Sequence, residues 1–288
     1  MSKLLAIGIA SIDIINQVNT YPDEDSEVRA YSQHILRGGN ATNTLAILSQ
    51  LGMDCYWAGT IADDSNKKII TDDLDYFKID YSHTKLLQQG INPTSYILVS
   101  SENASRSIVH YRDLVEYNFN SFRQIKLKDF DWLHFEGRNI QQLLQMLDYC
   151  KNQYPQLKIS VEIEKNRPEI ELLFAYADVL LFSKPYALSK GFNSGFDFLT
   201  QQQQRLGNKI MTCTWGEVGA DLYYQGKIYN SPAFPPEKII DTLAAGDTFN
   251  AAVINSLLLN QSPQKIISNA CRLAGRKCGK MGLELNIT

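Results

Sequence analysis

Short apolar runs alternate with longer amphipathic stretches along most of the chain. Bounded apolar runs of this length are typical of strands buried on both faces, and the spacing of apolar residues between them is helical. The predicted strands are Leu4–Ile12, Trp132–Glu136, Ile159–Glu164, Val179–Phe182 and Ile210–Thr214. The predicted helices are Ala41–Leu51, Ile140–Asn152, Pro168–Tyr176, Gly195–Leu206, Thr248–Leu259 and Pro263–Lys277. This alternation predicts an α/β fold with a mostly parallel sheet.

Two stretches interrupt the alternation. Residues 13–33 mix β-branched and polar residues around Pro22, and residues 94–111 follow the pattern strand, polar turn, strand. They are predicted to be antiparallel excursions from the core, either ordinary edge strands or a lid over a ligand site. The predicted division is a core of 1–12, 34–93 and 112–288, with a small β-sheet lid of 13–33 and 94–111.

The composition limits the kinds of partner. A chain of 288 residues with 44% hydrophobic residues can bury a core without disulfides. Its net charge of −3, from 28 basic and 31 acidic residues, disfavours nucleic acid as the main partner. Asp13 ends the N-terminal apolar run too early for a signal peptide, and no run approaches the roughly 18 apolar residues of a membrane span.

The five cysteines are widely spaced and contain no C-x-x-C pair. They are Cys55, Cys150, Cys213, Cys271 and Cys278. This usage indicates reduced thiols and a cytoplasmic protein, and it disfavours a zinc site.

The strongest motif is Asp241–Ala251, with the sequence DTLAAGDTFNA. Small residues before a helical pattern allow a tight turn that aims unpaired N–H groups at a ligand, and such a helix start binds anions. Asp247 is predicted to be either a helix N-cap or a base beside the anion site.

A second glycine motif, Arg37–Asn43, also leads into a helix. Asn40 and Asn43 are three residues apart, so their amides share one face of the first turn and suit the recognition of vicinal hydroxyls. The alternative is that Asn40 is simply the helix N-cap. Asp13 is predicted to lie at the end of the first strand, where α/β proteins place ligands, or to be a solvated turn residue.

Other motifs are weak or missing from the sequence. The Trp215–Gly219 segment, WGEVG, follows a predicted strand, but a turn is the simplest interpretation of its two glycines. The sequence has no Walker motif, no protein-kinase loop set, no nucleophile elbow and no metal-type histidine spacing. The first strand also lacks G-x-G-x-x-G, which disfavours a Rossmann-type dehydrogenase.

Together, the two glycine-containing motifs resemble the signatures of the ribokinase-like (PfkB) carbohydrate kinases, and within that family the chain is most similar to the ketohexokinases. Further matching stretches occur in the family's order at 21–27, 134–139, 161–165, 233–236 and 274–279. The resemblance implies a ribokinase-like three-layer core with a β lid, and transfer of the γ-phosphoryl group of ATP to the 1-hydroxyl of D-fructose.

The resemblance also implies roles for individual residues. Asp247 matches the catalytic base, and the backbone of Ala244, Ala245, Gly246 and Asp247 matches the anion hole. The positions that match sugar-binding residues are Asp13, Gly39, Asn40, Asn43 and Asp25, the last reaching the sugar of a partner subunit. The positions that match the ATP side are Arg106, Trp215, Gly216, Glu217, Val218, Gly219, Pro236 and Cys271.

The same resemblance implies two metals and a homodimer held by the lid. Mg²⁺ accompanies ATP, with Glu162 and Glu164 as candidate ligands, because Ser183–Tyr186 stands where many relatives have an N-x-x-E element. A potassium ion is implied near Asp241.

Alternative functions on the same fold remain open from the sequence. The substrate is fructose, or else ribose, tagatose or adenosine. A sugar phosphate would need extra cations, for which Arg37 and Arg138 are candidates. A catalytically weak sugar-binding regulator is favoured by Ala244, which replaces the usual glycine and would be strained if its φ is positive.

Overall fold

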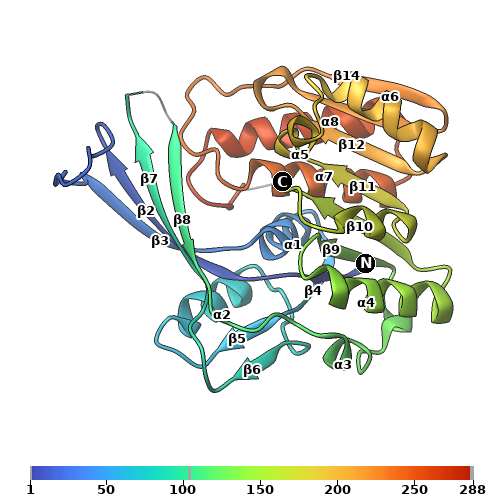
Figure 1. Ribbon diagram of the computed structural model, residues 1–288, viewed down its shortest axis with the longest axis horizontal. Coiled ribbons are helices and arrows are strands. Elements are labelled where there is room, and N and C mark those ends of the chain that lie inside the picture. Colours follow the sequence, from blue (N-terminus) through green and yellow to red (C-terminus); the bar gives the residue numbers. More distant parts are fainter. Residues whose placement is uncertain (1, 103–104, 286–288) are drawn as a thin grey trace.

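A large mixed sheet forms the centre of the molecule, and the computed structural model describes residues 2–102 and 105–285 (Figure 1). Its strands are β1 (Lys3–Ile7), β4 (Asp54–Ala58), β9 (Trp132–Glu136), β10 (Lys158–Ile163), β11 (Val179–Phe182), β12 (Ile210–Thr214), β13 (Ala220–Tyr224) and β14 (Lys227–Ser231). Their order is β14-β13-β12-β11-β10-β9-β1-β4, parallel from β4 to β12, with β13 and β14 antiparallel at one edge.

Helices cover both faces of this sheet and complete three layers. One face carries α1 (Asn40–Gln50), α2 (Lys67–Tyr76), α7 (Ala245–Leu258) and α8 (Pro263–Cys278). The other carries α3 (Phe119–Phe122), α4 (Ile140–Gln153), α5 (Lys184–Ser189), α6 (Gly195–Leu206) and the 3₁₀ helices η1 (Leu127–Asp129) and η2 (Ile170–Ala175). Alternate residues of β1 enter opposite layers, Leu4 and Ala6 on one side and Leu5 and Ile7 on the other. A strand buried on both faces is mostly apolar along its length, which explains the nearly continuous apolar runs.

A separate four-stranded sheet, here called the small sheet, projects from the core (Figure 1). Its strands are β2 (Ser11–Val18), β3 (Ser32–Gly38), β7 (Thr94–Ser100) and β8 (Arg106–Tyr111), in the order β3-β2-β7-β8. The central pair, β2 and β7, is parallel and joins segments far apart in the sequence, whereas the outer pairs are antiparallel. Two short strands, β5 (Thr60–Ala62) and β6 (Lys85–Leu87), form a third sheet.

The two faces of the small sheet differ. Asp13 and Arg106 lie on the same face of the small sheet. Arg106 is in register with a residue of β2 that is four positions from Asp13, and residues an even number of positions apart in a strand point to the same face. That face meets the core, since Arg106 Nη1 donates to Thr242 Oγ1 at 2.7 Å. The opposite face carries a row of apolar residues that we call the outer row: Ile35, Ile14, Tyr96 and Val109.

The α/β prediction is confirmed, and three of the predicted strands, β9, β11 and β12, have the predicted bounds. The single strand Leu4–Ile12 is wrong, because the chain leaves the large sheet after Ile7 and Ser11 begins β2 of the small sheet. The segment predicted as helix Pro168–Tyr176 is a 3₁₀ helix. Of the predicted turn at Ser101–Ser105, residues 103 and 104 lie outside the described residues.

Candidate active site

The double-glycine motif connects β3 to α1 in a very tight turn. Gly39 has φ +108°, and a Cβ there would lie 2.2 Å from the carbonyl oxygen of Ile9. Only glycine tolerates both the conformation and the contact. The turn begins α1 at Asn40, so Asn40 and Asn43 both lie in its first turn.

Asn40 is not the helix cap. The N-cap position is Gly39, and no side-chain capping bond is made there. The Asn40 amide instead donates to Glu162 Oε2 at 3.1 Å and to Glu164 Oε2 at 3.4 Å. The capping alternative is therefore wrong, and the amide faces two carboxylates at the carboxyl end of β10.

The second motif begins α7, and its carboxylate meets the first motif. Asp247 lies in the first turn of α7, and only 6% of the residue is exposed. Asn43 Nδ2 donates to Asp247 Oδ2 at 2.8 Å across 204 positions of sequence. The N-cap position is Ala244, with no side-chain cap, so Asp247 does not act as the cap.

Burial changes the acidity of this carboxylate. Desolvation raises the pKa of Asp247 from 3.8 to about 7, although the Asn43 hydrogen bond and the Arg37 charge act in the opposite direction. Burial also raises the pKa of Glu162 well above its usual range, and the Asp247 charge adds to this. Glu162 is held by two amides, because Asn250 Nδ2 donates to its Oε1 at 3.1 Å. The site therefore concentrates acidic groups that compete for protons.

Arg37 fixes the position of Asn43. Its side chain is fully buried, and its Nη1 donates to Asn43 Oδ1 and to Thr42 Oγ1, both at 2.8 Å. Its Nε donates to Asp73 of α2. The Asn43 amide is thereby oriented with its oxygen toward Arg37 and its nitrogen toward Asp247.

Asp13 reaches the same region from the small sheet. It is the third residue of β2, so the prediction that it ends the first strand is wrong. A Cβ on Gly38 would lie 2.2 Å from Asp13 Oδ2, which places this carboxylate against the double-glycine turn. Ser11 Oγ donates to its Oδ1 at 3.2 Å, and burial raises the pKa of Asp13.

Asp25 is not brought to this site. It lies in the exposed segment between β2 and β3, with φ +57°. This segment is at the outer end of the small sheet in Figure 1, away from the core. Any role in sugar binding would have to be played in another subunit.

Most of the residues that match the ATP side lie near β12 and α8, whereas Arg106 lies on β8 of the small sheet. Trp215 N donates to Gly219 O at 2.7 Å, which closes the loop after β12 around the 3₁₀ helix η3 (Gly216–Val218). Ala220 pairs with Ser231 across β13 and β14. The carbonyl oxygen of Ser231 accepts a hydrogen bond from the buried Cys271 thiol at 3.8 Å. Pro236 lies against the end of α8, because a Cβ on Gly279 would be 2.9 Å from Pro236 Cβ.

Asp241 does not fit a potassium ion. Its Oδ1 accepts from Leu243 N at 2.9 Å, and its Oδ2 accepts from Gly282 N at 3.2 Å and from Lys277 Nζ at 2.5 Å. A lysine ammonium already lies against this carboxylate. This contact argues against the predicted ligand role of Asp241.

Metal ligands elsewhere are sparse. Among residues 2–102 and 105–285, no group of three or more histidine, cysteine, aspartate or glutamate side chains is arranged to hold a metal ion. Glu164 is half-buried and close enough to Glu162 and Asp247 to raise the pKa of both, so it is the carboxylate best placed at the opening of the site.

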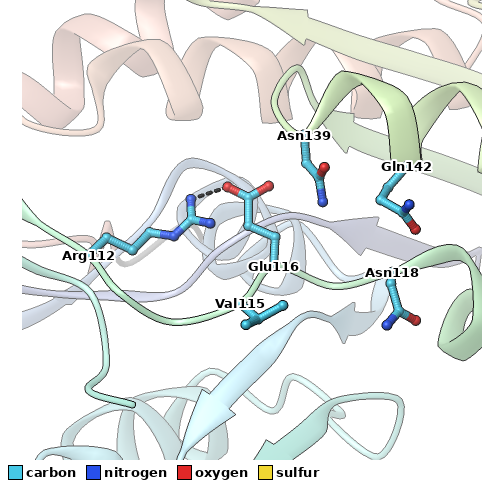
Figure 2. Close-up of a pocket in the computed structure, with 6 residues that line it drawn as sticks. All are labelled: Arg112, Val115, Glu116, Asn118, Asn139 and Gln142. Carbon is cyan, nitrogen blue, oxygen red and sulfur yellow. Dashed lines mark hydrogen bonds and ion pairs between the residues drawn. The ribbon is translucent and has the colours of Figure 1, made fainter.

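A cavity of about 510 Å³ lies next to this region, between the segment after β8 and the start of α4. Figure 2 shows Glu116 joined to Arg112, with Asn118, Asn139 and Gln142 around them. These amides support the local backbone: Gln142 accepts from Phe119 N at 2.8 Å and Asn118 accepts from Ser121 N at 3.0 Å.

Ion pairs connect this cavity to the main site. Arg138 donates to Glu116 and to Glu136, both at 2.8 Å, and Glu136 accepts from Ile9 N at 3.0 Å. The sequence assigned no role to Glu136. Its position at the carboxyl end of β9, where α/β proteins place ligand-binding groups, is the feature from which a role could have been predicted.

Polar groups at the carboxyl ends of parallel strands, together with helix starts, define a ligand-binding α/β protein. The fold is ribokinase-like: the structure of Arabidopsis thaliana ribokinase with ribose and ATP superposes with a TM-score of 0.79, at 18% identity, over 98% of this chain and 94% of that one. The pfkB family carbohydrate kinase model matches residues 1–288. The chain belongs to this family and is an ATP-dependent sugar kinase.

Two curated relatives span nearly the whole chain. Ketohexokinase of Mus musculus is 38% identical over 291 residues, which cover 98% of each chain. The ATP-dependent ribose-1-phosphate kinase of Halopiger xanaduensis is 21% identical and covers 94% of this chain and 90% of its own. Within the described residues, no helix is long and apolar enough to cross a membrane.

Proposed function

We propose that the protein transfers the γ-phosphoryl group of ATP to the 1-hydroxyl of D-fructose. The observation that carries the proposal is the bond between Asn43 and Asp247, which joins the two motifs around a buried carboxylate with a pKa of about 7. The 38% identity to a ketohexokinase supports fructose as the sugar.

Asp247 acts as the general base. A sugar hydroxyl is a weak nucleophile until its proton has an acceptor, and a carboxylate within hydrogen-bond reach supplies one. As the hydroxyl oxygen bonds to the γ-phosphorus, its proton moves to Asp247 and ADP leaves with the electrons of the broken P–O bond. A base with a pKa of about 7 is ionised in a useful fraction of molecules at neutral pH.

The start of α7 stabilises the transferred phosphoryl group. The N–H groups of Gly246 and Asp247 in its first turn have no preceding carbonyl of the helix as partner, whereas Ala245 N donates to Thr242 O at 3.4 Å. In phosphoryl transfer the negative charge is spread over equatorial oxygens, so fixed N–H dipoles at this position lower the barrier without covalent chemistry.

The sugar lies between the two motifs and the small sheet. Asp13, Asn40 and the Gly39 backbone supply donors and acceptors for hydroxyls. The small sheet acts as a lid, with Arg106 reaching Thr242 of the α7 motif. A lid that closes here would exclude water and suppress ATP hydrolysis.

ATP binds along the Trp215–Gly219 loop and the region of Pro236 and α8. The Mg²⁺ that accompanies ATP takes most of its ligands from phosphate and water, because Mg²⁺ keeps several waters in most protein sites. Glu164 is the protein carboxylate that would contact its shell, and the metal would neutralise charge on the phosphates.

The lid also forms a homodimer. The outer row supports this, because Tyr96 is 51% exposed and Val109 is 69% exposed, and both lie on the same face of the small sheet. Asp25 then completes the sugar site of the partner subunit.

The structure of the site favours an uncharged hydroxylated substrate over the alternatives. A sugar phosphate needs available cations, but Arg37 and Arg138 are both engaged in the pairs described above. Adenosine would be expected to meet apolar or aromatic surfaces, whereas Asp13 and Asn40 are polar. Tagatose differs from fructose only in the configuration at C4, and ribose is a smaller aldose, so both are uncharged and hydroxylated like fructose.

One observation favours a catalytically weak regulator as a second candidate. Ala244, the first residue of the predicted anion hole, adopts the left-handed conformation with φ +57°. A non-glycine residue is strained there, and this strain would reduce turnover.

A coupled assay of ADP release tests both candidates. We expect release to depend on fructose and to exceed that with ribose, tagatose, adenosine or fructose 6-phosphate. ³¹P–¹³C coupling in the product then identifies the phosphorylated carbon as C1. The highest activity on fructose 6-phosphate would overturn the substrate, and sugar binding without ADP release would establish the regulator instead.

A further inference from the structure

A buried lysine lies where the family resemblance implies a potassium ion. Lys277 is close to the end of α8, and its side chain is 1% exposed. Its Nζ donates to three oxygens: Asp241 Oδ2 at 2.5 Å, Asp241 O at 3.0 Å and Lys280 O at 3.3 Å. One carboxylate and two backbone carbonyls form the kind of oxygen set that a hard cation binds.

The neighbouring bonds make this cluster a structural junction. Asp241 Oδ1 accepts from Leu243 N, and Cys278 O accepts from both Ile240 N and Asp241 N, at 2.8 and 3.2 Å. The cluster therefore ties the end of α8 to the turn that leads into α7. The same turn contains Thr242, which Arg106 of the small sheet contacts.

We propose that the Lys277 ammonium is the resident cation of this junction and that no free monovalent cation binds at Asp241. An ammonium has three donors and matches the three oxygens. Being covalently attached, it loses no translational freedom on binding. A second cation at the same carboxylate would meet like charge in a buried setting.

The charge of Lys277 is balanced by the Asp241 carboxylate. Burial lowers the pKa of Lys277, and the Asp241 charge and hydrogen bond offset only part of this lowering. The nearby cation Arg106 lowers it slightly. The paired ammonium and carboxylate leave the junction close to neutral, which is the arrangement that a buried charge requires.

The first test uses the ligand-free wild-type protein, so it does not depend on the identity of the sugar. Its melting temperature is measured in potassium, sodium and tetramethylammonium chlorides at equal ionic strength. We expect the same melting temperature in all three salts. A potassium-specific rise that disappears in Asp241→Asn would show a free cation at this carboxylate and overturn the proposal.

The second test removes the tethered cation. Lys277→Ala leaves the oxygen cluster without its charge and opens space beside it, and we expect a loss of at least about 5 °C in tetramethylammonium, since a broken buried pair is strongly destabilising. Potassium or methylammonium should restore part of this loss. Lys277→Met fills the space and should show the loss without the restoration.

An exposed lysine of the same helix provides the control. Lys265→Ala should melt like the wild type in every salt, because Lys265 lies at the surface of α8. If Lys277→Ala also melts like the wild type in tetramethylammonium, the lysine is not the cation of this junction and the proposal fails.

Discussion

Stability and the proposed activity require opposite protonation states of Asp247. Its burial raises its pKa to about 7, so the fold favours the protonated form while the proposed reaction needs the ionised one. The stability contributed by the protonated form is fully present below about pH 4 and is lost as the pH rises through about 7. Activity and stability are therefore expected to change in opposite directions across this range.

Replacing Asp247 by asparagine separates the two properties. Asp247→Asn keeps the shape of the side chain but cannot take the hydroxyl proton, so kcat should fall by at least about 100-fold. Calorimetric titration should still detect sugar and ATP. At pH 8 the variant should melt above the wild type, because the buried group at position 247 can no longer ionise, and the difference should shrink toward pH 4. Near-normal turnover would remove Asp247 from the proposed role.

Ala244 provides a second prediction at this scale. Its φ of +57° is costly for alanine and free for glycine, so Ala244→Gly should stabilise the protein by about 1 kcal/mol. Scanning calorimetry should record a rise of about 2 °C or more. Ala245→Gly is the matched control, because Ala245 is the first helical residue of α7 and should gain nothing. An increase in kcat with Ala244→Gly would also argue that strain limits the wild type, whereas a fall in stability would contradict the prediction.

At the scale of elements, the site depends on the contact between α1 and α7. These helices come from distant parts of the sequence and lie on the same face of the large sheet. Arg37, which ends β3 beside Gly38, connects α1 to α2 through Asp73 and orients Asn43 toward α7. The relative position of three helices thus sets the geometry of one hydrogen bond.

Arg37→Gln tests this positioning role. Glutamine still offers a donor to Asn43 but removes the positive charge that lowers the pKa of Asp247. The acidic limb of the kcat–pH profile should therefore move to higher pH, with kcat reduced more than the sugar KM is raised. Arg205→Gln, at an exposed arginine of α6, should leave the profile unchanged. A lower kcat with an unshifted profile would indicate a purely structural role.

At the scale of the whole molecule, the small sheet has one face toward the active site and one face at the surface of the protein. One face approaches the core through Asp13 and Arg106, whereas Ile35, Tyr96 and Val109 of the outer row are exposed on the other face. Exposed apolar residues aligned across neighbouring strands favour association with another protein surface. The proposed dimer would place the two small sheets against each other.

Charge on the outer row should disrupt the dimer. Val109→Lys is expected to convert a dimer into a monomer in size-exclusion chromatography with light scattering. Val115→Lys is the control, because Val115 has the same exposure, 69%, but lies outside the small sheet. A wild-type monomer at all concentrations would refute the dimer.

Complementation tests whether Asp25 serves the partner subunit. Asp25→Ala and Asp247→Asn should each be nearly inactive alone. When the two are refolded together, heterodimers contain one site with an intact Asp247 and an intact Asp25 from the partner. Activity should therefore reappear on mixing, and its absence would place the function of Asp25 elsewhere.

The sequence by itself determined the class of fold and the two motifs. Parallel strands buried on both faces are mostly apolar, so runs such as Trp132–Glu136 and Ile210–Thr214 were recognisable locally and their bounds agree with the structure. The glycine-rich starts of α1 and α7 were also visible, because a tight turn before a helix has a local sequence requirement. The strand Leu4–Ile12 was predicted wrongly, since an apolar run does not reveal where the chain leaves one sheet for another.

Only the tertiary structure decided what the motif residues contact. Asn43 and Asp247 are 204 positions apart, and no local pattern predicts that their amide and carboxylate meet. The same is true of Lys277, which sequence periodicity places in a helix but which tertiary packing places against the Asp241 carboxylate. Local sequence controls backbone conformation, whereas charge burial and hydrogen-bond partners depend on the distant segments that pack around each side chain.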